Sequence, residues 1–191
     1  MTAVWILIGM GIIAALPFLR AAGVLKSPLG GVVRGLRGIV RGAFLISAVC
    51  SALVAVSQIA VVVTRNLFGV NFIWLQESAL YYFGAMFLLA GGAILLMDAH
   101  VRVDVFYAKW SEARQRWVNL AGLYLFVIPV GMLIIWASTP YVAASWATFE
   151  GSSDPSGIQG VFLLKTLVPV FGALLIMAAT VRAAELLERQ S

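Results

Sequence analysis

The chain has 191 residues, of which 62% are hydrophobic and 11% charged, and its mean hydropathy is +1.01. A soluble domain is nearer to about 45–50% apolar, and a chain this short cannot bury the excess in a core, so lipid has to cover it. The net charge of +5 does not indicate nucleic acid as a partner, because Lys and Arg gather at the ends of apolar runs, as in the cytoplasmic flanks of membrane helices.

The first apolar run, Ala3–Leu19, is near the lower length limit for a membrane span and carries Pro17 near its end. We predict that it crosses the membrane, and a helix lying along the interface is the alternative. No basic residue precedes the run, so it does not have the pattern of a classical signal peptide. The basic stretch Arg20–Arg41 follows, and its glycines and Pro28 predict a loop or a weak surface helix suited to anionic lipid headgroups.

Four further runs have the roughly 20 residues that a helix needs to cross about 30 Å of hydrocarbon. They are Gly42–Thr64, Ser78–Met97, Val118–Thr139 and Val161–Val181. The single cysteine, Cys50, lies within the first of them, which excludes an intrachain disulfide and favours a packing role. The predicted fold class is therefore all-α, a polytopic membrane protein with four core transmembrane helices and an N-terminal fifth.

Two connecting segments have a distinct composition. Arg65–Glu77 mixes aromatic and polar residues, with Trp74 placed as in an aromatic belt, which predicts a short amphipathic segment along the interface before the second core helix. Pro140–Gly160 contains no Lys or Arg and is rich in Ser, Gly and Pro, which predicts an irregular external loop.

The orientation follows from the basic residues. With five spans, eleven of the 13 Lys and Arg residues fall on one side of the membrane and two, Arg65 and Lys165, on the other. This asymmetry places the basic loops and the C-terminus in the cytoplasm, and the N-terminus outside. The eleven are Arg20, Lys26, Arg34, Arg37, Arg41, Arg102, Lys109, Arg114, Arg116, Arg182 and Arg189.

The predicted spans contain few side chains that could catalyse a reaction or bind an ion or a cofactor. Gln58 is the only strongly polar side chain well inside one, and we interpret it as an interhelical hydrogen-bonding group, since ion and proton pathways usually carry charged residues. The only histidine, His100, is one ligand short of the usual pair for a buried b-type haem. The sequence therefore predicts no catalytic residue, no metal ion and no cofactor, and the protein is not expected to be an enzyme.

Small residues recur along the first two core spans. Ser47 and Ser51 are four residues apart, whereas Gly84 and Gly91 are seven apart, as are Ala85 and Gly92. Such faces allow helix backbones to approach closely in lipid. The pattern fits equally with packing inside the chain and with a surface for another subunit.

The order of short motifs resembles the small membrane subunit, or Q component, of tripartite ATP-independent periplasmic (TRAP) transporters. A span ends in RNLFG, WLQE precedes the next span, and HVRVD follows it at residues 100–104. The likeness covers Arg41–Leu187. It predicts an N-terminal extension (residues 1–40), a four-helix membrane domain (41–187) and a cytoplasmic tail (188–191).

The resemblance implies a non-catalytic scaffold subunit in the bacterial inner membrane. Its implied partners are a large multi-span subunit (the M component), a periplasmic substrate-binding protein and membrane lipids, in a sodium-coupled transporter that imports a carboxylate-type solute. The expected interface residues are Trp74 and Glu77 at the outer surface, and His100, Arg102 and Asp104 at the inner end of the second core span.

Two other functions are alternatives. A membrane anchor of a respiratory or redox complex would bind haem, which the absorbance spectrum of the purified protein would reveal. A small autonomous channel or exporter would transport without a partner in liposomes, and the absence of charge within the spans argues against it.

Overall fold

The protein is an assembly of long helices, seen here in a computed structural model that describes residues 2–21, 29–98, 107 and 109–188. These residues include no strand, which confirms the all-α prediction. The helices are α1 (Thr2–Ala21), α2 (Leu29–Leu67), α3 (Ile73–Leu96), α5 (Glu112–Gly122), α6 (Ile128–Ala147) and α7 (Val161–Glu188), with a π-helical turn, η1 (Leu123–Val127), between α5 and α6.

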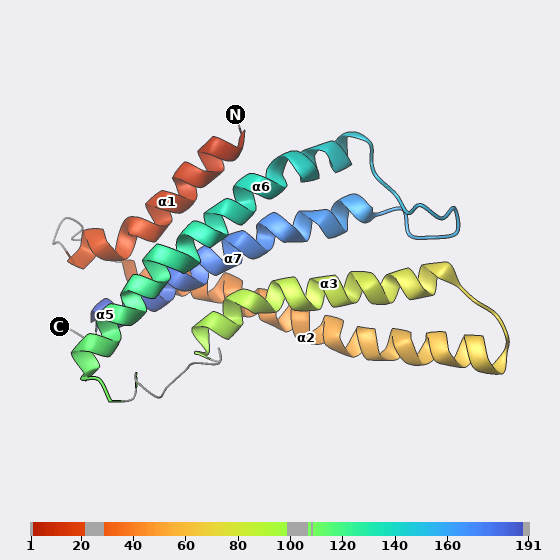
Figure 1. Cartoon of the computed structure of the whole chain (residues 1–191), viewed down its shortest axis with the longest axis horizontal. Coiled ribbons are helices and arrows are strands. Elements are labelled where there is room, and N and C mark those ends of the chain that lie inside the picture. Colours follow the sequence, from red (N-terminus) through yellow and green to blue (C-terminus); the bar gives the residue numbers. More distant parts are fainter. Residues whose placement is uncertain (1, 22–28, 99–106, 108, 189–191) are drawn as a thin grey trace.

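The core is built from two helical hairpins (Figure 1). Helix α2 packs against α3, α6 packs against α7, and α3 and α7 pack against each other to join the hairpins, while α1 lies against α6 and α7. The connections 68–72 and 148–160 lie at the same end of the bundle, which we call the loop end (Figure 1). The opposite end, which we call the basic end, comprises residues 29–41, 97–98, 109–116 and 182–188 (Figure 1).

Four helical stretches are long and apolar enough to cross a membrane: 30–67, 73–96, 112–147 and 161–188. They contain the four predicted core spans, except that Met97, the last residue of the second, lies one residue beyond its helix. The third stretch changes to π geometry over 123–127, just before Pro129. Proline lacks the amide hydrogen that an α-helix needs at this position, and a π turn is a common way to accommodate the loss.

Helix α2 is longer than the sequence suggested. Its 39 residues correspond to about 58 Å, roughly twice the hydrocarbon thickness. Residues 29–41 are therefore neither a loop nor a separate surface helix but the first turns of α2, because after Pro28 no further proline interrupts the helix. The proposed boundary between residues 40 and 41 thus falls inside one helix.

The segment Arg65–Glu77 is likewise not a separate helix. Arg65–Leu67 end α2, residues 68–72 make the turn, and Ile73–Glu77 begin α3. Gly69 supplies a positive φ of 66°, and the Val70 amide donates to the Thr64 carbonyl. The amphipathic composition therefore belongs to the tip of a hairpin.

Helix α7 contributes more buried residues than any other helix that the structure describes. Ile176, Ala178, Ala179, Val181 and Ala183 are all completely buried. Many of these side chains are small, so neighbouring helices approach α7 closely, which is how helices associate in lipid without a hydrophobic driving force.

The small-residue stripes were open to two interpretations, packing inside the chain and a surface for another subunit, and the structure supports a different one for different residues. Ser47 is buried and donates to the Met86 carbonyl of α3 over 2.7 Å. Gly91 and Gly92 face Phe171 and Leu174 of α7, so their stripe serves packing inside the chain. Ser51 remains exposed.

Helix α1 is held from its middle to its C-terminal part. Met10 and Ala14 are buried in a cluster shared with α6 and α7, and the Tyr124 hydroxyl donates to the Ala14 carbonyl over 2.8 Å. Phe18 packs edge to face on the Tyr124 ring. The 20 residues of α1 reach about 30 Å, which is long enough to match the hydrocarbon thickness.

Candidate functional site

A single carboxylate organises the loop end. Glu77, in the first turns of α3, accepts a hydrogen bond from the Ser152 hydroxyl with one oxygen and from the Ile158 amide, at 2.6 Å, with the other. Ser152 and Ile158 both belong to the connection between α6 and α7. The predicted interface residue Glu77 therefore ties the second hairpin to the first.

The connection that Glu77 binds has no room for a side chain at Gly157. A Cβ at this position would lie 2.6 Å from the Glu77 Oε2 atom and even closer to the Ser152 hydroxyl. Asp154 forms the turn itself, since its carbonyl accepts from the Gly157 amide at 2.9 Å. Its side chain accepts two hydrogen bonds from Ser156, which lower the pKa of the Asp154 carboxyl.

An ion pair closes the base of the same loop. The Lys165 ammonium donates to Glu150 Oε2 over 2.5 Å and lies 4.2 Å from the centre of the Tyr141 ring. The hydrogen bond from Lys165 lowers the pKa of the Glu150 carboxyl. Three aromatic rings, those of Trp146, Phe149 and Phe162, pack together beside this pair.

Low pH is expected to destabilise the hairpin of α6 and α7. Because the folded state holds the Glu150 pKa below its ordinary value of 4.5, the ion pair contributes stability above that pH, and the contribution is lost as the pH falls through the folded pKa. The thermal unfolding midpoint of the wild type should fall below pH 4.5 more steeply than that of Glu150→Gln. Parallel midpoint curves for the two proteins would contradict the assignment.

The tip of the α2–α3 hairpin is apolar and exposed. Trp74 is 51% exposed and packs only loosely on Phe72, with ring centres 6.1 Å apart. Leu67 and Phe68 beside them are more than two-thirds exposed. Such a cluster fits either an interfacial anchor or a contact for another protein.

The basic end is crosslinked by ion pairs that the sequence did not reveal. Arg182 of α7 donates to Asp98 at the end of α3 over 3.1 Å and to Glu185 over 3.2 Å. Glu185 also pairs with Arg37 of α2. The network joins three helices at one level, whereas the predicted residues His100, Arg102 and Asp104 lie outside the described residues.

The polar side chain of Gln58 lies on the outside of the bundle. Gln58 is exposed on α2, and within the described part of the chain its amide makes no hydrogen bond, so the predicted interhelical bond is not found there. Ala48, Ser51 and Ala55 are exposed on the same side of the helix, since they precede Gln58 at intervals of three and four residues. We call these four residues the small-polar face of α2.

Comparison with known proteins identifies the family. The family model described as "Tripartite ATP-independent periplasmic transporters, DctQ component" matches residues 54–189. The chain belongs to this family. It is a multi-pass membrane subunit of a TRAP transporter. No curated protein and no solved structure matches it.

The matched region of this DctQ component includes the whole loop end. Trp74, Glu77, the 148–160 connection and helix α7 all fall within it, whereas α1 and residues 29–53 of α2 do not. Among the contacts at the two ends of the bundle, sequence analysis missed Ser152, Lys165 as the partner of Glu150, and the network at the basic end. Glu150, within the segment Pro140–Gly160 that was predicted to be an external loop, was a signal for the second of these. Residues 140–147 of that segment are not a loop but the last turns of α6.

Proposed function

We propose that this chain is a non-catalytic scaffold subunit that binds the large M component of a TRAP transporter and helps anchor it in the membrane. The observation that carries the proposal is the small-polar face of α2, which is exposed along a span that the chain itself leaves uncovered. Small residues with an occasional amide are the composition of helix contacts in lipid.

The two exposed sides of α2 differ in composition. The small-polar face consists of Ala48, Ser51, Ala55 and Gln58, while the adjacent exposed side carries bulky aliphatic residues. These residues are Leu45, Val49, Val56 and Val63. An amide in hydrocarbon without a partner costs about 1–3 kcal/mol, so Gln58 favours a protein neighbour, whereas the aliphatic side suits lipid.

We take the M component to be the protein that covers the small-polar face of α2, because of the family to which the chain belongs. TRAP transporters are tripartite, so a DctQ component has two further proteins to work with, the M component and the periplasmic binding protein. The DctQ component contributes no charged side chain to the middle of its described spans. We therefore assign sodium coupling and movement of the carboxylate-type solute to the M component.

The charge asymmetry supports a topology in the bacterial inner membrane. The basic end, with Arg34, Arg37, Arg41 and Arg182, faces the cytoplasm together with the C-terminus. The loop end faces the periplasm, where the binding protein delivers its solute. Helix α1 forms a fifth span of the N-terminal extension, residues 1–40.

The interface assignments follow from this topology. At the periplasmic surface, Trp74 contacts the M component or the binding protein directly, and Glu77 shapes the loop that lies beside it. On the cytoplasmic side, His100, Arg102 and Asp104 fix the inner end of α3 against the large subunit. Replacing Trp74 or Arg102 with alanine should then lower solute uptake, and unchanged uptake in both would remove these assignments.

Co-purification tests the proposal. The tagged chain, co-expressed with the multi-span protein encoded beside it and extracted in mild detergent, should retain that protein. Ala55→Leu should lower the yield of the complex severalfold, because it adds bulk to the small-polar face. Val56→Leu, one residue along on the aliphatic side, is the matched control and should leave the yield unchanged. Recovery of the chain alone, or equal yields for the two variants, would contradict the proposal.

A further inference from the structure

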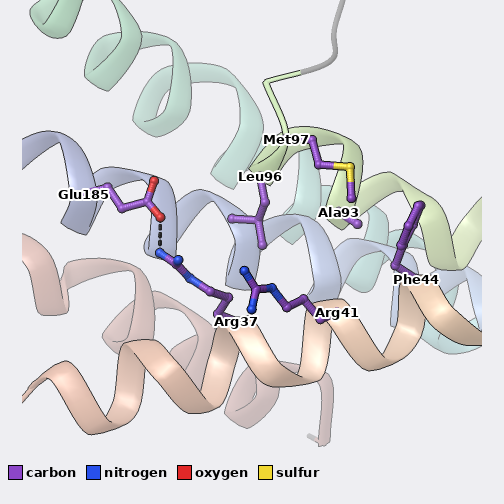
Figure 2. Close-up of a pocket in the computed structure, with 7 residues that line it drawn as sticks. All are labelled: Arg37, Arg41, Phe44, Ala93, Leu96, Met97 and Glu185. Atoms are coloured by element: carbon purple, nitrogen blue, oxygen red, sulfur yellow. Dashed lines mark hydrogen bonds and ion pairs between the residues drawn. The ribbon is translucent and has the colours of Figure 1, made fainter.

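A second feature of the molecule lies at the basic end, between α2, α3 and α7. A cavity of about 140 Å³ is lined there by three residues of α2, two of α3, the residue that caps α3 and one of α7. Figure 2 shows the side chains of Arg37 and Arg41 reaching into this space, with Phe44 farther along α2. The remaining lining residues are Ala93, Leu96, Met97 and Glu185.

The charges of this cavity do not balance. Arg37 and Arg41 are four residues apart on α2, so their like charges face the same space. Glu185 pairs with Arg37, as the dashed line in Figure 2 marks. The side chain of Arg41 makes no ion pair or hydrogen bond with any residue that the structure describes. One guanidinium is therefore left for an anion.

The cavity is polar on one side and apolar on the other. Arg37 and Arg41 lie toward the end of the bundle, and Phe44 continues along α2 in the direction of the membrane interior. Ala93 and Leu96 of α3 form the facing apolar wall. Charge followed by hydrocarbon is the order of groups in a phospholipid. A guanidinium binds a phosphate through two parallel hydrogen bonds, and basic pockets between transmembrane helices bind anionic headgroups.

We infer that this cavity binds the phosphate of an anionic phospholipid, with Arg41 as the main ligand. Arg37 adds a second positive charge that is partly neutralised by Glu185. Phe44, Leu96 and Met97 contact the first part of an acyl chain. The lipid fills the junction of the two hairpins at the basic end.

Lipid titration of the full-length chain tests the inference. Native mass spectrometry in detergent should detect bound phosphatidylglycerol and much weaker binding of phosphatidylcholine with the same acyl chains. Arg41→Gln should weaken phosphatidylglycerol binding about tenfold, which corresponds to about 1.4 kcal/mol. Arg41→Lys, which keeps the charge and loses the paired donors, should fall between that variant and the wild type.

Arg65→Gln is the matched control, because it removes one positive charge from the other end of the same helix. It should bind phosphatidylglycerol as the wild type does. The inference is overturned if Arg41→Gln and Arg65→Gln bind alike or if phosphatidylcholine binds as well as phosphatidylglycerol. Displacement of the lipid by millimolar inorganic phosphate would equally overturn it, since the cavity would then be an anion site without lipid recognition. Arg41 is exposed and has no partner among the described residues, so the unfolding midpoint of its variants in lipid-free detergent should stay unchanged.

Discussion

Replacing Gly131 with alanine is expected to destabilise the protein by about 1–3 kcal/mol, because the α6 and α7 backbones touch at this residue. A Cβ on Gly131 would lie 2.9 Å from the Gly172 carbonyl oxygen and 2.7 Å from a side-chain carbon of Ile176. The contact is reciprocal, since a Cβ on Gly172 would lie 2.8 Å from the Gly131 carbonyl oxygen. A backbone oxygen cannot rotate away, so the two helices have to separate.

The effect can be measured by unfolding the chain in mixed micelles of mild detergent and dodecyl sulfate while following helicity by circular dichroism. Gly122→Ala is the matched control on the same helical run, because a Cβ on Gly122 would meet no atom of a neighbouring helix within 4 Å. It should be neutral, or stabilising by up to about 1 kcal/mol, since alanine is the better helix former. Equal stability of the two variants would show that α6 and α7 do not need this close approach.

Combining Gly131→Ala with Gly172→Ala gives a second test of the contact between α6 and α7. Gly131→Ala and Gly172→Ala act on one contact, so once the first methyl group has separated the helices the second should cost less than it does alone. Additive losses would mean that the two glycines act at independent places. The same separation should lower the yield of the complex with the large subunit, because α7 joins the two hairpins.

The helices were predictable because lipid imposes a simple rule. Each span needs about 20 apolar residues, and each of the four predicted core spans matches a long helix of the structure to within one residue at its ends or lies inside it. The limits of α2 were not predictable by the same rule. Hydropathy marks the apolar part of the helix, whereas Arg34 and Arg37 lie in turns that continue α2 beyond it, and arginine is a good helix former.

The candidate site was predictable only in part. Glu77 stood out as an acidic residue between an aromatic cluster and a span, but its partners are 75 and 81 residues away along the chain. Arg37 and Glu185 are 148 residues apart, and nothing in their local sequence relates them. Such pairs depend on how hairpins pack, and packing in lipid follows the shape of small residues more than any pattern of charge.

Replacing Glu77 with alanine should release the loop between α6 and α7. The change leaves the Ile158 amide and the Ser152 hydroxyl without their acceptor, at a cost of about 1–3 kcal/mol for groups that are not fully hydrated. Amide hydrogen exchange across residues 152–158 should then rise by at least about tenfold, since each 1.4 kcal/mol of local stability is a factor of ten. Helix α7 itself should keep its protection.

Two further variants separate the role of the carboxylate from a general loss of order. Gln76→Ala, next to Glu77, removes a hydrogen bond to Asn71 within the hairpin tip and should leave exchange at 152–158 unchanged. Gly157→Ala keeps the carboxylate but puts a methyl group against it, so it should raise exchange as Glu77→Ala does.

Solute uptake then distinguishes two roles for Glu77. Both carboxylate oxygens are already bound within the chain, so Glu77 acts by holding the loop in place. Glu77→Ala and Gly157→Ala should therefore reduce uptake to a similar degree. If Gly157→Ala released the loop and left uptake intact while Glu77→Ala abolished it, the carboxylate would have to contact a partner directly, and the role proposed for the loop would be wrong.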